Sequence, residues 1–108
     1  MLADRVDYVL DHSGSGQEGG AWKDERRPSE VLGEQFWFCS IDDPSTLDGV
    51  LARFGHGHVL LEVDYPHADS TWPDTQTFVH DTIGNLPPAV IDGITHQNAE
   101  ELFRWQVL

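Results

Sequence analysis

Two apolar runs of strand length, separated by one amphipathic segment, limit most strongly what this chain can fold into. The runs are QFWFCS at residues 35–40 and HVLLEVD at residues 58–64. Continuous apolar runs are typical of strands that are covered on both faces, as in parallel sheets. Between them, apolar residues recur at helical spacing, at Leu47, Val50, Leu51 and Phe54. Pro44 suits the first turn of this helix and Gly55 its end. A strand, a helix and a strand in this order predict a parallel α/β unit.

The segments on either side of this unit carry further helical patterns. Leu2, Val6, Val9 and Leu10 form one stripe of a helix that ends near His12. Residues 75–84 and 88–95 predict two short helices. A last helix is expected to start at Asn98, where Glu101 completes a capping-box-like pair. Its apolar residues, which we expect to face inward, are Ala99, Leu102 and Phe103.

Residues 13–28, SGSGQEGGAWKDERRP, show no apolar period. Their glycines and charges predict a flexible connection within a single domain that spans residues 1–108.

Charge and cysteine content exclude several classes of function. The chain has 108 residues and a formal net charge of −13, so it would be repelled by nucleic acid and by anionic membrane surfaces. Its one cysteine, Cys39, excludes an internal disulfide, and its place in an apolar run predicts a buried, inert thiol. No signal peptide and no apolar run long enough to span a membrane is recognisable, which predicts a cytoplasmic protein.

The loop DYPHADSTWP, residues 64–73, concentrates polar chemistry directly after the second predicted strand. In parallel α/β folds, ligands bind at the carboxyl ends of strands, where the loops converge. We therefore expect a reactive site that includes Asp64.

Three stretches of the sequence resemble a known family. They are FCSIDDP, VLLEVDYPHADSTWP and LPPAVIDGITHQNAEELF. They resemble the C-terminal third of the metal-dependent amidohydrolase-related family that includes the aminocarboxymuconate-semialdehyde decarboxylase-like enzymes. The resemblance extends from the first helix to Phe103. It implies an α/β fold in which this chain is a C-terminal fragment of a (β/α)8 TIM barrel, the seventh and eighth strands with their helices.

The resemblance also implies roles for residues of the loop. Asp64 matches the aspartate at the tip of strand eight, which binds the catalytic metal or accepts a proton from metal-bound water. His67 would join it as a catalytic residue, and Ser70 and Trp72 would contact the substrate. The implied cofactor is a divalent metal ion, zinc or manganese. One departure is Val63, which stands where the family usually has a small hydroxyl residue.

The family's other metal ligands, which are histidines, would precede Met1. His56 and His58 do not replace them, because seven strand residues would hold them about 20 Å from Asp64. We interpret these two histidines as turn residues. A zinc-like site needs three or more protein ligands. The chain alone is therefore expected to be inactive, and to self-associate or to bind a missing N-terminal barrel portion.

Three hypotheses for function follow. The first is a part of a metal-dependent hydrolase or decarboxylase of a small carboxylate or amide-like substrate. The second is a truncated, non-catalytic remnant or structural subunit that functions only by association with another chain. The third, a free-standing metal module of Asp64, His67 and Asp69, is the least favoured because a loop alone would not fix the geometry of these residues.

Overall fold

The computed structural model describes residues 2–12, 22–40 and 44–106. The chain divides into two compact units, Met1–Phe36 and Trp37–Leu108, and each is presented by itself. The predicted flexible connection at residues 13–28 falls in the first unit. Residues 13–21 of it lie outside the described part of the chain.

The first unit contains two helices, α1 (Leu2–His12) and α2 (Pro28–Gln35). The helix α1 confirms the prediction from the apolar stripe. Asp7 of α1 accepts hydrogen bonds from the backbone N–H of Ser29 at 2.9 Å and from the Ser29 hydroxyl at 2.7 Å. Because the first N–H groups of a helix have no partner within that helix, Asp7 caps α2 from a neighbouring helix. Arg27 adds ion pairs to Asp7 at 3.1 Å and to Asp11 at 2.8 Å.

Helix α2 was not predicted, and the predicted strand at residues 35–40 is correspondingly too long. Gln35 is the last residue of α2, and the strand begins only at Phe38. The signals for the helix were Pro28 at its first position and Glu30, whose carboxylate accepts the Arg27 N–H at 2.6 Å. An apolar run does not by itself distinguish the end of a helix from the start of a strand.

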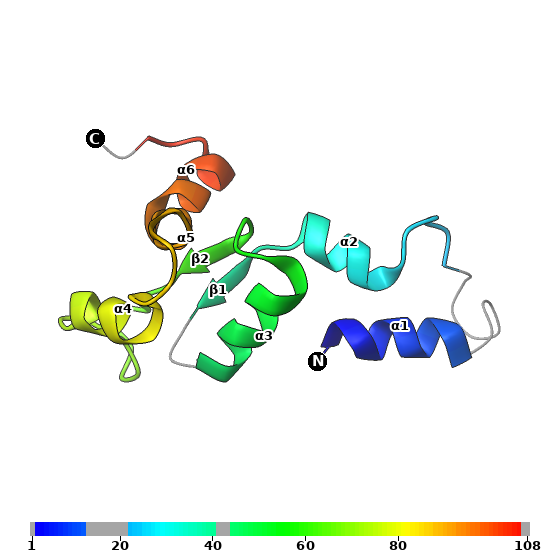
Figure 1. Ribbon diagram of the computed structural model, residues 1–108, viewed down its shortest axis with the longest axis horizontal. Coiled ribbons are helices and arrows are strands. Elements are labelled where there is room, and N and C mark those ends of the chain that lie inside the picture. Colours follow the sequence, from blue (N-terminus) through cyan, green and yellow to red (C-terminus); the bar gives the residue numbers. More distant parts are fainter. Residues whose placement is uncertain (1, 13–21, 41–43, 107–108) are drawn as a thin grey trace. The chain divides into compact units, whose positions relative to one another are not determined.

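The second unit begins with the predicted parallel β-α-β arrangement. Strand β1 (Phe38–Ser40) is followed by α3 (Pro44–Phe54) and by β2 (Val59–Leu61). The two strands pair in parallel, with Phe38 opposite Val59 (Figure 1). Helix α3 ends as predicted at Gly55, whose φ of +76° is a left-handed conformation that glycine adopts readily.

The core of the second unit lies between α3, β2 and the helices that follow. Its buried residues are Leu47, Val50, Val59, Ile83 and Ile94. Ile83 is the last residue of α4 (Thr75–Ile83), which matches the predicted helix at residues 75–84. Ile94 and Val59 are each only 1% exposed, so the contact between strand and helix excludes water most completely there.

One continuous helical run replaces the two helices predicted after residue 87. It consists of α5 (Pro88–Asp92), the π-helix η1 (Gly93–Gln97) and α6 (Asn98–Phe103). Helix α6 begins at Asn98 as predicted, but the predicted cap there is wrong, because Asn98 has helical dihedral angles and continues the run from η1. The prediction that Phe103 faces inward is also wrong, since it is 70% exposed. A helical period identifies an apolar face but not whether another element covers that face.

The strand β1 is less covered than its apolar sequence predicts. Cys39 is exposed, which corrects the expectation of a buried thiol. Among the described residues, β1 pairs with β2 and with no other strand, so one of its edges has no strand beside it. Partial burial, with a smaller contribution from Glu62, raises the pKa of the Cys39 thiol. Within the described ranges, no helix combines the length and the apolar character that a membrane span requires.

Candidate functional site

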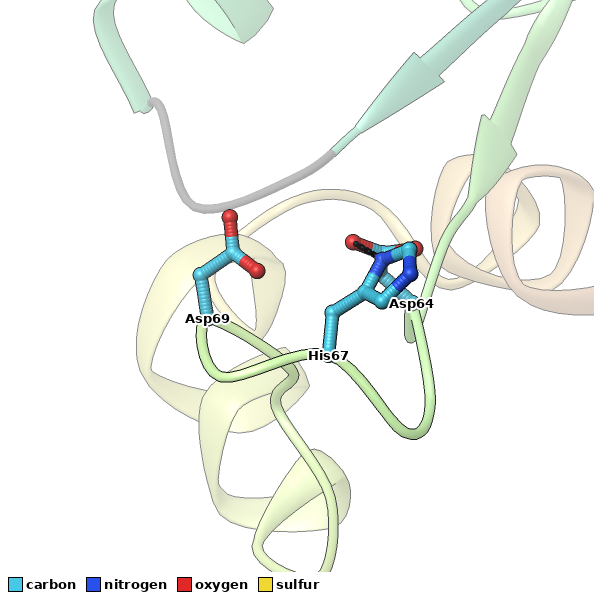
Figure 2. Close-up of side chains that lie close together, drawn as sticks. All are labelled: Asp64, His67 and Asp69. Carbon is cyan, nitrogen blue, oxygen red and sulfur yellow. Dashed lines mark hydrogen bonds and ion pairs between the residues drawn. The ribbon is translucent and has the colours of Figure 1, made fainter.

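The loop after β2 holds Asp64 and His67 in direct contact. One Asp64 carboxylate oxygen, Oδ2, lies 2.9 Å from His67 Nδ1 (Figure 2). The backbone N–H of His67 also donates to the carbonyl oxygen of Asp64, at 2.9 Å. Asp64 has a φ of 55°, a left-handed conformation that aspartate tolerates better than most residues. The chain therefore turns sharply at Asp64 and brings the imidazole back onto its carboxylate.

The two members of this pair differ in exposure and in electrostatics. The Asp64 side chain is 25% exposed and the His67 side chain is 70% exposed. The hydrogen bond to Asp64 raises the pKa of His67, and the charges of Asp64 and Asp69 add to the effect. The imidazole thus keeps its proton to a higher pH than a free histidine.

A third side chain, Asp69, comes close to the pair. One ligand atom from each of Asp64, His67 and Asp69 lies within 4.8 Å of the other two. Figure 2 shows the three side chains projecting from the same side of the loop. Around a tetrahedral zinc ion, ligand atoms at about 2.0–2.2 Å from the metal lie about 3.3–3.6 Å from one another, so the three side chains would have to draw closer to bind one ion. Two carboxylates and an imidazole are a donor set that divalent metal ions accept.

Ser70 and Trp72, the predicted substrate contacts, lie at the far end of the same loop. The Ser70 hydroxyl donates to the carbonyl oxygen of Val63 at 2.8 Å and accepts the Trp72 N–H at 3.1 Å. The Thr71 N–H donates to the same Val63 oxygen at 3.2 Å. The Trp72 ring meets Tyr65 edge-on, with the ring centroids 6.0 Å apart, and remains 61% exposed. The loop is therefore closed by its own hydrogen bonds and leaves the indole accessible.

A surface hollow of about 340 Å³ adjoins the loop. Its lining includes Asp69, Ser70 and Trp72 from the loop and Phe78 from α4. The hollow gives a small molecule access to the side of the loop on which Asp69 and the indole lie.

The histidines His56 and His58 lie before β2, whereas Asp64 follows it. His58 stacks on Trp37, with ring centroids 4.3 Å apart, and the His56 carbonyl oxygen accepts a hydrogen bond from the Asn98 side chain at 2.6 Å. Asn98 is a buried polar residue whose bonds to backbone carbonyl oxygens were not predicted, because its place three residues before Glu101 indicated a helix cap.

Comparison with known proteins identifies the family of this chain. A search of curated proteins finds no match. The family model described as "Amidohydrolase" matches residues 1–105, which is nearly the whole chain and includes the loop with Asp64 and His67. The chain therefore belongs to the amidohydrolase family.

Proposed function

We propose that this chain contributes Asp64 and His67 to the active site of a metal-dependent hydrolase or decarboxylase. The substrate would be a small carboxylate or amide-like molecule. The observation that carries the proposal is the 2.9 Å contact between Asp64 Oδ2 and His67 Nδ1, directly after a parallel strand of an amidohydrolase-family chain. The loop sequence DYPHADSTWP further supports a place among the aminocarboxymuconate-semialdehyde decarboxylase-like members of the family.

The fold that we propose for the complete enzyme is a (β/α)8 barrel, to which this chain gives strands seven and eight. The parallel pairing of β1 and β2 through α3 supports this assignment. The two strands would then need further strands at their edges, because an unpaired edge presents free N–H and C=O groups. A preceding part of the barrel, or other copies of this chain, would supply them.

The proposed cofactor is a divalent ion, zinc or manganese, held by Asp64 with His67 and Asp69 within reach. When bound, such an ion polarises a substrate carbonyl or activates a water molecule. The chain's own contribution is to hold a proton. The imidazole of His67, kept in place by the Asp64 carboxylate, accepts a proton when it is neutral and returns it when it is charged. Ser70 and Trp72 remain the proposed substrate contacts.

The test of this proposal uses the isolated chain and a polypeptide that carries the preceding barrel strands. Calorimetric titration should show weak binding of zinc or manganese by the isolated chain, and stronger binding once the other strands are added. Asp64→Asn should abolish the gain, whereas the matched control Asp81→Asn, on an exposed carboxylate of α4, should keep it. A gain that is unaffected by Asp64→Asn would overturn the assignment.

A second function, association without catalysis, is favoured by exposed apolar side chains in the second unit. They are Tyr65, Trp72, Phe103 and Trp105. In this alternative the chain is a structural subunit that covers these rings with another chain. Metal binding, measured by calorimetry beside light scattering, separates the two: zinc binding that is lost in Asp64→Asn favours the enzyme, and a stable oligomer that does not bind metal favours the subunit. A cytoplasmic location stays a prediction in either case.

A further inference from the structure

We infer that Ser70 is a positioning residue, whose hydroxyl sets how the Asp64–His67 pair and the Trp72 ring lie relative to each other. The inference deepens the proposed function and rests on it, because the residues that Ser70 would position are those to which that proposal assigns roles. It gives Ser70 a role in the free protein, before any substrate binds.

The hydroxyl of Ser70 joins two backbone positions that flank the candidate site. It donates to the carbonyl oxygen of Val63 at 2.8 Å and accepts the N–H of Trp72 at 3.1 Å. Val63 directly precedes Asp64, so the first bond fixes the point at which the strand leads into the turn. The second bond fixes the backbone that carries the indole. One oxygen atom thus connects the two ends of the loop segment that contains both Asp64 and His67.

The backbone of Ser70 extends the same connection to the imidazole. Its N–H donates to the carbonyl oxygen of His67 at 3.2 Å. Ser70 therefore forms hydrogen bonds with Val63, His67 and Trp72. Serine hydroxyls commonly make such local bonds to the backbone in turns.

Removal of the hydroxyl should loosen the loop without unfolding the chain. The N–H of Thr71 also donates to the Val63 oxygen, at 3.2 Å, so the strand end keeps one partner in a Ser70→Ala variant. The Trp72 N–H loses the side-chain acceptor that it has in the described structure. Since Trp72 is already 61% exposed, water can replace that acceptor and the core is left intact.

The two possible roles of Ser70 differ in a measurable way. A hydroxyl that only contacts substrate has no effect on Trp72 or His67 in the absence of substrate. A hydroxyl that positions the loop changes both in the free protein. A measurement without ligand therefore separates the roles.

The experiment is ¹⁹F NMR of the chain labelled with 5-fluorotryptophan, with the Trp72 resonance assigned by Trp72→Phe. The His67 ring signals are recorded on the same variants by ¹H–¹³C NMR. The variants are Ser70→Ala, the conservative Ser70→Thr, and the control Thr77→Ala, which changes another hydroxyl beside the loop. In Ser70→Ala we expect the Trp72 resonance to sharpen and move to the position of a solvated tryptophan, and the His67 signals to shift. Ser70→Thr should restore both, and Thr77→Ala should leave both unchanged.

The inference is overturned if the Trp72 and His67 signals of Ser70→Ala superimpose on those of the unchanged chain. If Ser70→Ala unfolds, which would alter all four tryptophan resonances together, the threonine variant decides. Wild-type signals in Ser70→Thr then support the role of the hydroxyl, and an altered Trp72 resonance in a folded Ser70→Thr contradicts it. If zinc binding is unaffected by Asp64→Asn, the proposed function is wrong, but the NMR result on the Ser70 variants remains valid.

Discussion

The side-chain amide of Asn98 donates a hydrogen bond to the carbonyl oxygen of Val59 at 2.7 Å, which joins the helical run to the first residue of β2. The same amide nitrogen donates to the His56 carbonyl oxygen at 2.6 Å. Asn98 is 7% exposed, so these bonds form away from water. A single side chain therefore holds the start of the strand whose other end leads to Asp64.

Replacing Asn98 by alanine should destabilise the second unit substantially. The Val59 carbonyl oxygen would lose a buried donor, which costs about 1–3 kcal/mol. The His56 carbonyl oxygen would keep the Val59 N–H, at 3.1 Å. Urea unfolding followed by circular dichroism would measure the change. The adjacent, exposed Gln97→Ala should stay within about 0.5 kcal/mol of the original chain. Equal free energies of unfolding for the two variants would show that the Asn98 bonds do not stabilise the strand.

Ile94 should be the most sensitive apolar position in the helical run. It is 1% exposed in the core, so Ile94→Ala is expected to lower the free energy of unfolding by about 2–5 kcal/mol. Ile94→Val removes one methyl group and should cost only about 0.5–1.5 kcal/mol. Thermal unfolding of the two variants should be measured side by side. An alanine variant that is no less stable than the valine variant would contradict the importance of Ile94 for the core.

The contact between α1 and α2 should weaken in acid. Hydrogen bonds from Ser29, with a further contribution from Arg27, lower the pKa of Asp7 below its usual 3.8. A carboxylate with a lowered pKa stabilises the folded state at pH values above its unfolded pKa, and this stabilisation disappears as pH falls through the lowered value. The Ser29 amide signal in NMR should therefore stay constant from pH 7 down to about 4 and shift below that. Asp7→Asn should shift it already at pH 7, whereas Asp48→Asn, in the other unit, should not.

The β-α-β arrangement was predictable because three signals agreed: two apolar runs, a helical stripe between them and a glycine at the helix end. The helix at Pro28–Gln35 was missed although Pro28 and Glu30 indicated its start, and its bonds to Asp7, more than twenty positions earlier, follow from no local pattern. The prediction that Cys39 is buried was wrong for a related reason. Burial depends on which elements pack against a strand, and the sequence of that strand does not contain this information.

The position of the candidate site in the chain was easier to predict than its geometry. The position of Asp64 after a strand indicated a reactive loop, and the structure brings His67 onto it. The approach of Asp69 was not expected, because the loop was thought unable to fix three ligands. The loop is closed by hydrogen bonds from Ser70 and Thr71 to Val63 and turns at Asp64 in a left-handed conformation, and residue types alone indicated neither.

His67 should titrate above the ordinary histidine value. Its hydrogen bond to Asp64 raises the pKa from 6.5. A histidine with a raised pKa contributes stability that is fully present below 6.5 and is lost as pH rises through the raised value, so the loop should be most ordered in mild acid. NMR titration of the His67 ring should show the raised pKa, and Asp64→Asn should return it toward 6.5. The control Asp81→Asn should leave the His67 titration unchanged, and a normal pKa in the original chain would show that the pair does not form in solution.

Calorimetric titration of zinc into the chain at pH 8 and pH 6, with and without Asp64→Asn, tests most directly whether Asp64 and His67 form a metal-dependent site. A protonated His67 repels a cation and holds the Asp64 carboxylate that would bind it, so affinity should fall as pH drops below the pKa of His67. We therefore predict weak binding at pH 8 that is largely lost at pH 6, and no binding at either pH in Asp64→Asn. Binding at pH 8 that is equally strong in Asp64→Asn, or that does not change between pH 8 and pH 6, would contradict the assignment of this loop as the metal-binding and proton-accepting part of an amidohydrolase.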